Sequence, residues 1–244
     1  MALVTGKPVF MDDLVPKDCL IVKLLRSPHA NAIVKEINKT AAEKVPGIEA
    51  IYTWEDVPQQ RFTTAGQTYP EATPYDRLIL DQHVRFVGDP VAIIAGEDEA
   101  CVEKAMRLIK VKYEVLPHIR TIEEAAAEDA PKVFDEEENN ICAHKHISRG
   151  NADEAIRNSK YVISHHFQTP WTEHAFLEPE CAVALYDEDG DIFVYSTDQS
   201  AHQTLHECSL LLGTDRVKVQ NALVGGGFGG CTINLVKDEL YSTF

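Results

Sequence analysis

The sequence predicts an α+β fold that is built from two successive parts. Three observations lead to this prediction. Short β-prone runs recur through the first 120 residues, one strongly amphipathic stretch interrupts them, and a hairpin, a helix and another strand follow in the second half. Strand, helix and strand in such short succession are typical of a compact α+β unit, which we place over about residues 15–120.

The elements of the first part follow from local patterns. The apolar run VAIIA at residues 91–95 predicts a short buried strand. Residues 98–109 predict an amphipathic helix, because their apolar side chains share one side. Thr40 and Glu43 have the spacing of a capping box, which predicts a short helix that ends at Pro46. Further strands are expected at 19–25, 32–37, 48–53 and 111–115, and a capped turn at 53–56.

The second part begins after a change in character. Residues 121–150 are acidic and then polar and irregular, so we expect a linker there. Beyond it, the run Asp-Glu-Asp-Gly-Asp has strong turn chemistry and predicts a hairpin. Gly213 is expected to cap the end of a helix at 200–212. The other expected elements are a helix at 153–159 and strands at Lys160–Thr169, Cys181–Tyr186, Ile192–Ser196 and Arg216–Val219.

Composition limits the classes of function. The 244 residues are 44% hydrophobic and 25% charged, with a net charge of −16. This charge disfavours nucleic acid and anionic membrane surfaces as partners, because both are bound through clusters of Lys and Arg side chains. No apolar run approaches the roughly 18–20 residues of a membrane-spanning helix. The N-terminus lacks the pattern of a signal peptide and the six cysteines are scattered, so we expect a cytoplasmic protein with reduced thiols.

The most informative motif is the glycine loop VGGGFGG at residues 224–230. Its glycines predict backbone that turns sharply or lies close to a bulky group, and successive N–H groups there can bind an anion. The loop fits G-x-G-x-x-G, but only 14 residues follow Gly230, which leaves no room for a dinucleotide-binding βαβ unit. A triphosphate loop needs a lysine where Cys231 stands. A tight structural turn and a site for a different cofactor remain as the alternatives.

The histidines have a structural interpretation beside a functional one. His202 and His206 are spaced i, i+4 on the expected helix, but Glu207 follows the second histidine, so the zinc motif H-E-x-x-H is absent. His165 and His166 would point to opposite faces of the expected strand and could not act as a pair. We therefore expect structural or surface roles for all four.

Carboxylates and an amide mark two further candidate positions. The segment EHAFLEPE at residues 173–180 places several carboxylates near a strand start, where they could do acid–base work or remain exposed. Gln199 lies between the end of an expected strand and the start of a helix, so its amide could reach a ligand. Helix capping by the neighbouring Ser or Asp explains the same pattern equally well.

A series of motifs runs along nearly the whole chain: LRSPHA (25–30), PGI (46–48), RFVGDPVA (85–92), VKYEVLP (111–117), EHAFLEPE (173–180), STDQS (196–200), LG (212–213) and VGGGFGG (224–230). In this order they resemble the molybdenum hydroxylase family, the large subunits of xanthine dehydrogenases and aldehyde oxidases. Residues 1–120 are similar to the family's α/β-hammerhead domain. After the acidic linker at 121–150, residues 151–244 resemble the start of its molybdopterin-binding domain.

The resemblance implies a molybdopterin cofactor at the glycine loop. Gln199 matches the family glutamine that hydrogen-bonds the apical ligand of the molybdenum. The loop positions that the resemblance places beside the cofactor are Gly226, Gly227, Phe228 and Gly229. It implies no metal ligand in this chain, and the family's catalytic base would lie beyond residue 244.

The activity that the resemblance implies is hydroxylation of an N-heterocycle or an aldehyde, a small-molecule substrate, with oxygen from water. Family purine hydroxylases commonly continue the loop with Lys-Glu, whereas Cys231 and Thr232 stand here, which disfavours a purine. The partners would be the remaining molybdopterin-binding portion and iron–sulfur and FAD subunits. We expect the chain to be inactive alone, and to self-associate through apolar surface meant for that portion. The alternative is a non-catalytic fragment or assembly module of the same fold that binds no metal.

Overall fold

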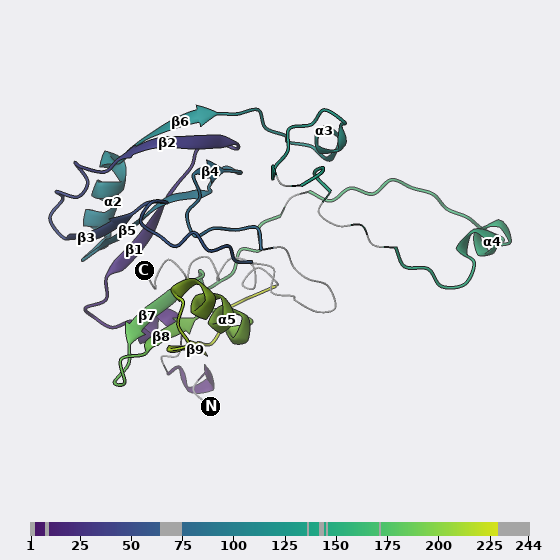
Figure 1. Ribbon diagram of the computed structural model, residues 1–244. Helices are drawn as coiled ribbons and strands as arrows, with labels where there is room; N and C mark the ends of the chain where they lie inside the picture. Colours follow the sequence, from purple (N-terminus) through teal and green to yellow (C-terminus); the bar gives the residue numbers. More distant parts are fainter. Residues whose placement is uncertain are drawn as a thin grey trace. The chain divides into compact units, whose positions relative to one another are not determined.

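The computed structural model describes residues 3–7, 10–63, 75–135, 137–141, 144, 146–170 and 172–228. The chain forms two compact units (Figure 1), one that combines residues 1–116 with 174–244 and one that comprises 117–173. In chain order the elements are η1 (Leu3–Thr5), α1 (Met11–Leu14), β1 (Ile21–Arg26), β2 (Ala32–Asn38), β3 (Ile48–Tyr52), β4 (His83–Val84), β5 (Pro90–Gly96), α2 (Glu99–Leu108), β6 (Lys110–Val115), α3 (Ile122–Ala126), α4 (Ala152–Arg157), β7 (Ala182–Tyr186), β8 (Ile192–Ser196), α5 (Ala201–Leu212) and β9 (Val217–Asn221).

Small sheets form the framework of the first unit. In the described part of the chain, their strand orders are β1-β5-β3, β4-β2-β6 and β7-β8-β9. Strand β5 lies in the middle of its sheet and is antiparallel to both neighbours. Every residue of β5 except Ala95 is buried. This result confirms the buried strand that the run VAIIA predicts.

Helix α2 also has the predicted position, with one residue at each end of the expected range acting as a cap. The Asp98 carboxylate accepts a 2.7 Å hydrogen bond from the Cys101 N–H, which satisfies a donor that the first helical turn leaves open. Val102 and Ala105 are fully buried and pack with Ala92 and Ile94 of β5. The amphipathic pattern therefore places this helix on the sheet.

The third sheet and α5 position the segments that follow them. Strands β7 and β8 form the predicted hairpin, with Ala182 opposite Ser196 and Tyr186 opposite Ile192. Strand β9 runs parallel to β8, and α5 makes the connection between them and packs on β9. Gly213 ends α5 with a φ of 64°, in the left-handed region, as the sequence predicts.

The hammerhead-like part and the later part of the first unit share one hydrophobic core. Its buried members are Val57, Phe62, Ile79, Leu80 and Ile93 from the first part and Cys208, Leu211 and Val217 from the second. Helix α5 is thus packed on one side against residues far away in the sequence. Gln199 lies just before Ser200, the N-cap of this helix.

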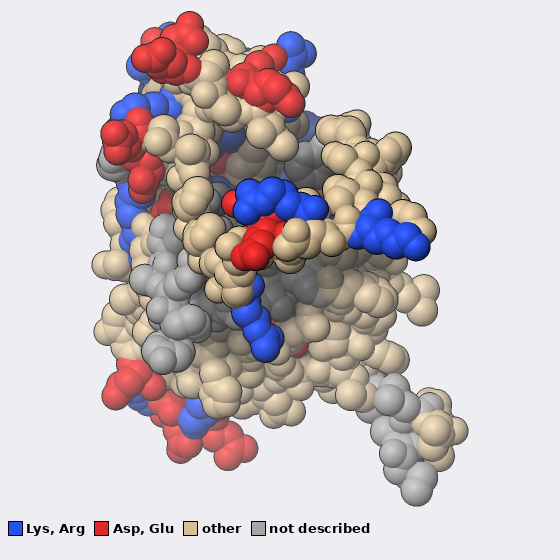
Figure 2. All heavy atoms as spheres, turned by 90° about the vertical axis from the view of Figure 1, so that its right-hand side faces the viewer, with Lys and Arg blue, Asp and Glu red and all other residues tan. Residues whose placement is uncertain are grey.

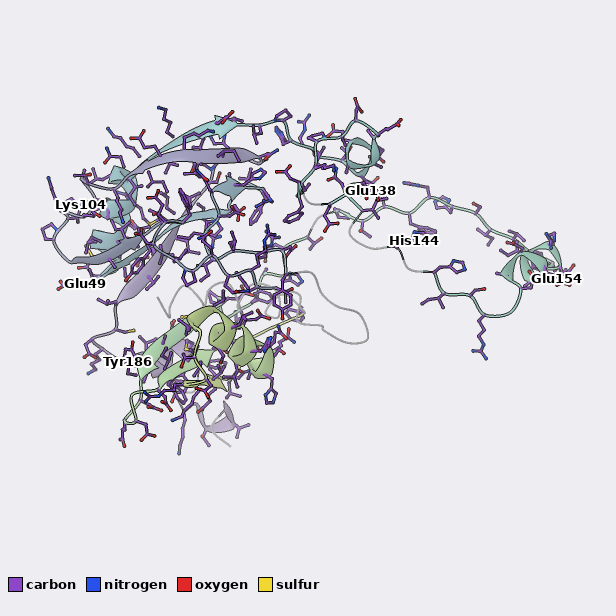
Figure 3. All side chains as sticks on the ribbon, viewed as in Figure 1. Glu49, Lys104, Glu138, His144, Glu154 and Tyr186 are labelled. Carbon is purple, nitrogen blue, oxygen red and sulfur yellow. The ribbon has the colours of Figure 1, made fainter. Side chains whose placement is uncertain are left out.

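The second unit has little regular structure. Its helices α3 and α4 are short and contain no buried residue. Figure 3 labels Glu138, His144 and Glu154 along this unit, and all three are exposed. Every residue from 146 to 170 is exposed as well.

Two expected elements are wrong. Residues 40–44 form turns and no helix, because the Thr40 N–H, which a capping box would pair with Glu43, donates to Oδ1 of Asn38 instead. The strand expected at Lys160–Thr169 is also wrong, since the segment has no regular secondary structure and no ladder with any described strand. A β-prone composition stabilises a strand only through cross-strand neighbours. His165 and His166 are both simply exposed.

Charged side chains are distributed in patches over the surface. On the face that Figure 2 presents, Lys and Arg lie in small separate groups among neutral residues and groups of Asp and Glu. Among the helices that the structure describes, none is long and apolar enough to cross a lipid bilayer.

Candidate functional site

The candidate site lies where two parallel strands end. Ser196 is the last residue of β8 and is paired with Asn221, the last residue of β9. Because the strands are parallel, the segments that follow them leave from the same edge of the sheet, where ligands bind in open sheets of this kind. One segment carries Gln199 into α5 and the other is the glycine loop. Ala222 N–H donates a 2.8 Å bond to Ser196 O, and Asn221 Nδ2 donates a 2.8 Å bond to Asp198 O.

A buried carboxylate fixes the segment that carries Gln199. Asp198 is 2% exposed, and one of its oxygens accepts a hydrogen bond from the Ser200 N–H. The hydroxyls of Ser196 and Thr204 donate to the other oxygen. A buried carboxylate is stable only when it is hydrogen-bonded in this way. Gln199 itself is exposed, between two residues whose positions this network determines.

The amide of Gln199 lies directly against the glycine loop. A β-carbon built on Gly227 would be 2.6 Å from Cδ of Gln199 and 2.8 Å from its Nε2 and Oε1. These separations are shorter than any van der Waals contact, so no residue with a side chain fits at 227 while Gln199 keeps its position. The absence of a side chain at Gly227 is therefore explained first by Gln199.

On its other side the loop contacts the EHAFLEPE segment. Oε2 of Glu178 accepts a 2.7 Å hydrogen bond from the Gly225 N–H. A β-carbon on Gly225 would overlap with Cβ of Glu178. Oε1 of the same carboxylate accepts a 3.2 Å bond from the N–H of Met11, the first residue of α1. Glu178 is half-buried and binds backbone N–H groups, whereas Glu173 at the start of the segment is exposed.

Three stacked rings continue the contact between the two segments. Phe176 lies nearly parallel to Phe228, with ring centroids 6.2 Å apart, and His174 lies nearly parallel to Phe176, with centroids 5.4 Å apart. Ala175 and Phe228 have φ values of 50° and 47°, in the left-handed region that costs a residue with a side chain about 1–2 kcal/mol. Gly226 has a φ of 150°, and a β-carbon there would lie 3.3 Å from the Phe228 ring and 3.6 Å from Cβ of Phe176. The Phe228 ring is 75% exposed.

A buried carboxyl that sequence patterns do not reveal lies on α5. Glu207 is fully buried, and Oε2 has no hydrogen-bond partner among the described residues. Burial raises the pKa of Glu207, while hydrogen bonds from the Thr63 N–H and the Gln203 amide and the nearby His206 counteract part of that rise. This carboxyl belongs to the core side of α5 and not to the loop.

The histidines do not form a metal site in the part of the chain that the structure describes. No group of three His, Cys, Asp or Glu residues there could hold a metal ion. His202 and His206 are exposed on α5, and Nε2 of His206 lies 3.3 Å from the Tyr75 hydroxyl.

The predicted loop residues divide into two groups. Gly227 contacts Gln199, and Gly226 lies beside Phe228. The structure thus brings four of the five expected positions, Gln199, Gly226, Gly227 and Phe228, into one region. Gly229 lies outside the described residues, as do Gly230, Cys231 and Thr232. Sequence reasoning considered Asp198 only as a possible helix cap and Glu178 only as part of an acidic segment, and predicted neither as a support of the loop. A polar residue beside a strand end was the available signal for Asp198, and no local signal exists for Glu178.

Comparison with known families shows which family the chain belongs to. A model of the aldehyde oxidase and xanthine dehydrogenase a/b hammerhead domain matches residues 5–117. A model of the molybdopterin cofactor-binding domain matches residues 133–242. The chain belongs to the molybdenum hydroxylase family. The resemblance and the fold class are therefore confirmed: an α+β chain with a hammerhead domain followed by the first part of a molybdopterin-binding domain.

Individual members of the molybdenum hydroxylase family show the same likeness. The chain is 36% identical to the xanthine dehydrogenase molybdenum-binding subunit of Escherichia coli O157:H7, over 94% of this chain and 31% of that protein. It is 31% identical to the nicotinate dehydrogenase large molybdopterin subunit of Eubacterium barkeri, over 93% of this chain and 52% of that protein. These relatives are named as subunits of larger enzymes. The chain thus spans only about a third to a half of their length.

Solved structures agree. Quinoline 2-oxidoreductase from Pseudomonas putida 86 superposes with a TM-score of 0.82 and 27% identity, over 94% of this chain and 30% of that one. Aldehyde oxidoreductase from Desulfovibrio gigas superposes with a TM-score of 0.84 and 25% identity, over 99% of this chain and 28% of that one.

Proposed function

We propose that this chain contributes part of the molybdopterin site of an enzyme that hydroxylates an N-heterocycle or an aldehyde with oxygen from water. The observation that supports this function most is the contact between Gln199 and Gly227. The family resemblance gives both of these features to the cofactor, and the fold brings them together although they are distant in the sequence. If the glycine loop were only a structural turn, it would not need the exposed amide of Gln199 beside it.

The residues fit a large cofactor with hydrogen-bonding and anionic groups. Gln199 and Phe228 are exposed, so a bound group can reach both. A carboxamide offers a donor and an acceptor, and glycine backbone allows N–H groups to approach an anion closely. When bound, a molybdenum cofactor supplies the two-electron redox and oxygen-transfer chemistry, and the protein supplies its position.

Each part of the site has a separate task in this proposal. Asp198 holds the backbone on both sides of Gln199, so that the amide is oriented before anything binds. Gly226 and Gly227 keep the loop free of side chains where a cofactor would approach. Phe228 would cover one side of the bound group and exclude water from it.

The rest of the proposal concerns what lies outside this chain. The catalytic base and the remaining molybdopterin-binding portion would come from residues or a subunit beyond position 244, and iron–sulfur and FAD subunits would accept the electrons. In this scheme the chain divides into a hammerhead domain at 1–120, an acidic linker at 121–150 and the cofactor-binding part at 151–244, and the enzyme works in the cytoplasm.

The test is the molybdenum and released pterin per chain in protein that is purified anaerobically with its copurifying subunits. We expect near-stoichiometric molybdenum in the wild type and a several-fold loss of retained cofactor in Q199A, because one hydrogen bond to the cofactor is removed. Gln220→Ala, at an exposed glutamine on β9, is the matched control and should retain the cofactor. A wild-type complex without molybdenum would contradict the proposal and favour the alternative, a non-catalytic assembly module.

A further inference from the structure

The glycine loop is held by a residue that the proposed cofactor chemistry does not use. Glu178 presents both carboxylate oxygens to backbone N–H groups: Oε2 to Gly225 at 2.7 Å and Oε1 to Met11 at 3.2 Å. These two groups lie 47 residues after and 167 residues before the glutamate in the sequence. One side chain therefore connects three segments of the first unit.

Local chemistry explains why a carboxylate suits this position. Each oxygen of an ionised carboxylate is an acceptor only, so two N–H donors can be satisfied at once. Hydrogen bonds of an N–H group to a charged acceptor are about twice as strong as those between neutral groups. A carboxamide has one acceptor oxygen and one donor NH₂, so it could satisfy only one of the two N–H groups.

The contact is anchored at each end. Met11 is 1% exposed, so the N–H that meets Glu178 belongs to a residue whose side chain is fixed in the core. Because Gly225 has no side chain, the loop can lie this close to Glu178, whose Cβ would overlap with a β-carbon there. Phe176, two residues before Glu178, stacks on Phe228 three residues beyond Gly225. The EHAFLEPE segment thus contacts the loop at two points, one polar and one aromatic.

We propose that Glu178 is a positioning residue, which sets the path of the glycine loop by joining Gly225 to the N-terminal helix α1. Through this carboxylate the N-terminal segment becomes part of the support of the loop. The significance of this role for cofactor binding rests on the proposed function, but the role itself does not.

The test is amide hydrogen exchange, resolved by residue, on the full chain. In E178A we expect the amides of both Gly225 and Met11 to exchange at least roughly tenfold faster, the lower limit for loss of a hydrogen bond to a charged acceptor. In E178Q we expect faster exchange at one of these two amides and not at both. Glu188→Ala, at an exposed glutamate in the β7–β8 turn, is the control and should leave both rates unchanged.

Amides inside α5 report whether each variant remains folded. If E178A proves to be unfolded by this criterion, E178Q decides the matter, because it keeps the size and shape of the side chain. Unchanged exchange at both amides in a folded variant would overturn the proposal, and so would an equal acceleration in Glu188→Ala. A wild-type complex without molybdenum would overturn the proposed function and leave this result untouched.

Discussion

The Gln199 amide occupies the space that a β-carbon on Gly227 would need, with Cδ only 2.6 Å from that position. The backbone of Gly227 does not have the positive φ that would itself require glycine. The restriction at this position is thus steric and comes from one side chain. Mutating Gln199 and Gly227 separately and together can therefore test the contact.

We expect Gly227→Ala to destabilise the chain by no more than about 1 kcal/mol, because the group in the way is the end of the exposed Gln199 side chain, which can move aside. Gln199→Ala alone should cost less than about 0.5 kcal/mol, because the residue is exposed. The double variant should recover most of the stability that Gly227→Ala loses. Urea unfolding of the four proteins measures this coupling, and strictly additive effects would show that the contact is not what excludes a side chain.

Asp198 should be the most sensitive residue around the site. Asp198→Ala removes the acceptor of Ser200 N–H and of two hydroxyls inside the protein, and we expect a loss of about 2–4 kcal/mol of unfolding free energy. Asp215→Ala, at an exposed aspartate just after α5, is the control and should change stability by less than about 0.5 kcal/mol. Equal unfolding midpoints for the two variants would contradict the importance of this network.

Glu207 should make stability depend on pH. Burial raises its folded-state pKa above that of an unfolded glutamate, so its stabilising contribution is fully present below the unfolded pKa of about 4.3 and is lost as pH rises through the folded value. Glu207→Gln stays neutral, and we expect it to gain in melting temperature relative to the wild type as pH rises from 4 to 8. The exposed Glu188→Gln should run parallel to the wild type. A constant difference between Glu207→Gln and the wild type across this range would show that Glu207 does not titrate there.

Lys218 should control the titration of the β7–β8 turn. Its Nζ lies 2.6 Å from Asp187 and 3.1 Å from Asp191, and its hydrogen bonds are the largest cause of the lowered pKa of both carboxyls. Lys218→Met should raise both pKa values toward the ordinary range. Both should rise only in part, because Arg216 still donates a 2.7 Å hydrogen bond to Asp191, and the N–H groups of Asp189 and Asp191 still donate to Asp187.

Carboxyl carbon chemical shifts followed by NMR measure these pKa values directly. The stability that the lowered pKa values contribute is present above the unfolded-state pKa and is lost as pH falls through the folded-state pKa values. The unfolding free energies of the wild type and Lys218→Met should therefore converge in acid. Unchanged titration curves in the variant would contradict the prediction.

Elements with a strong local pattern were predictable from the sequence. Strand β5 buries an apolar run, and helix α2 buries an apolar stripe. The residues between β7 and β8 favour a tight turn, which predicts a hairpin. The expected helix at Thr40 failed because the Thr40 N–H donates to Asn38, so the capping box that the spacing predicts does not form. The expected strand at Lys160–Thr169 failed because pairing partners are not encoded locally.

The candidate site was likewise predictable from the sequence only in part. Gln199 and the glycine loop were each predictable as candidate positions, and the family resemblance placed both at one cofactor. The parallel pairing of β8 and β9 that brings them together is seen only in the fold. The role of Glu178 was not predictable, since it depends on N–H groups of Gly225 and Met11 that only the folded chain brings to it. Burial of Glu207 was equally hidden, because a glutamate in an amphipathic helix is ordinarily solvated.

The exposed stretch from 158 to 170, which follows helix α4, has a practical consequence for anyone who handles this protein. Exposed backbone without ladder or helix is where proteases cut first, and Tyr161, Ile163 and Phe167 offer side chains that many of them accept. The first unit is built from chain on both sides of such a cut and shares one core through Phe62 and Leu211. A nicked preparation should therefore run as two bands on a denaturing gel while it still elutes as a single species from a sizing column.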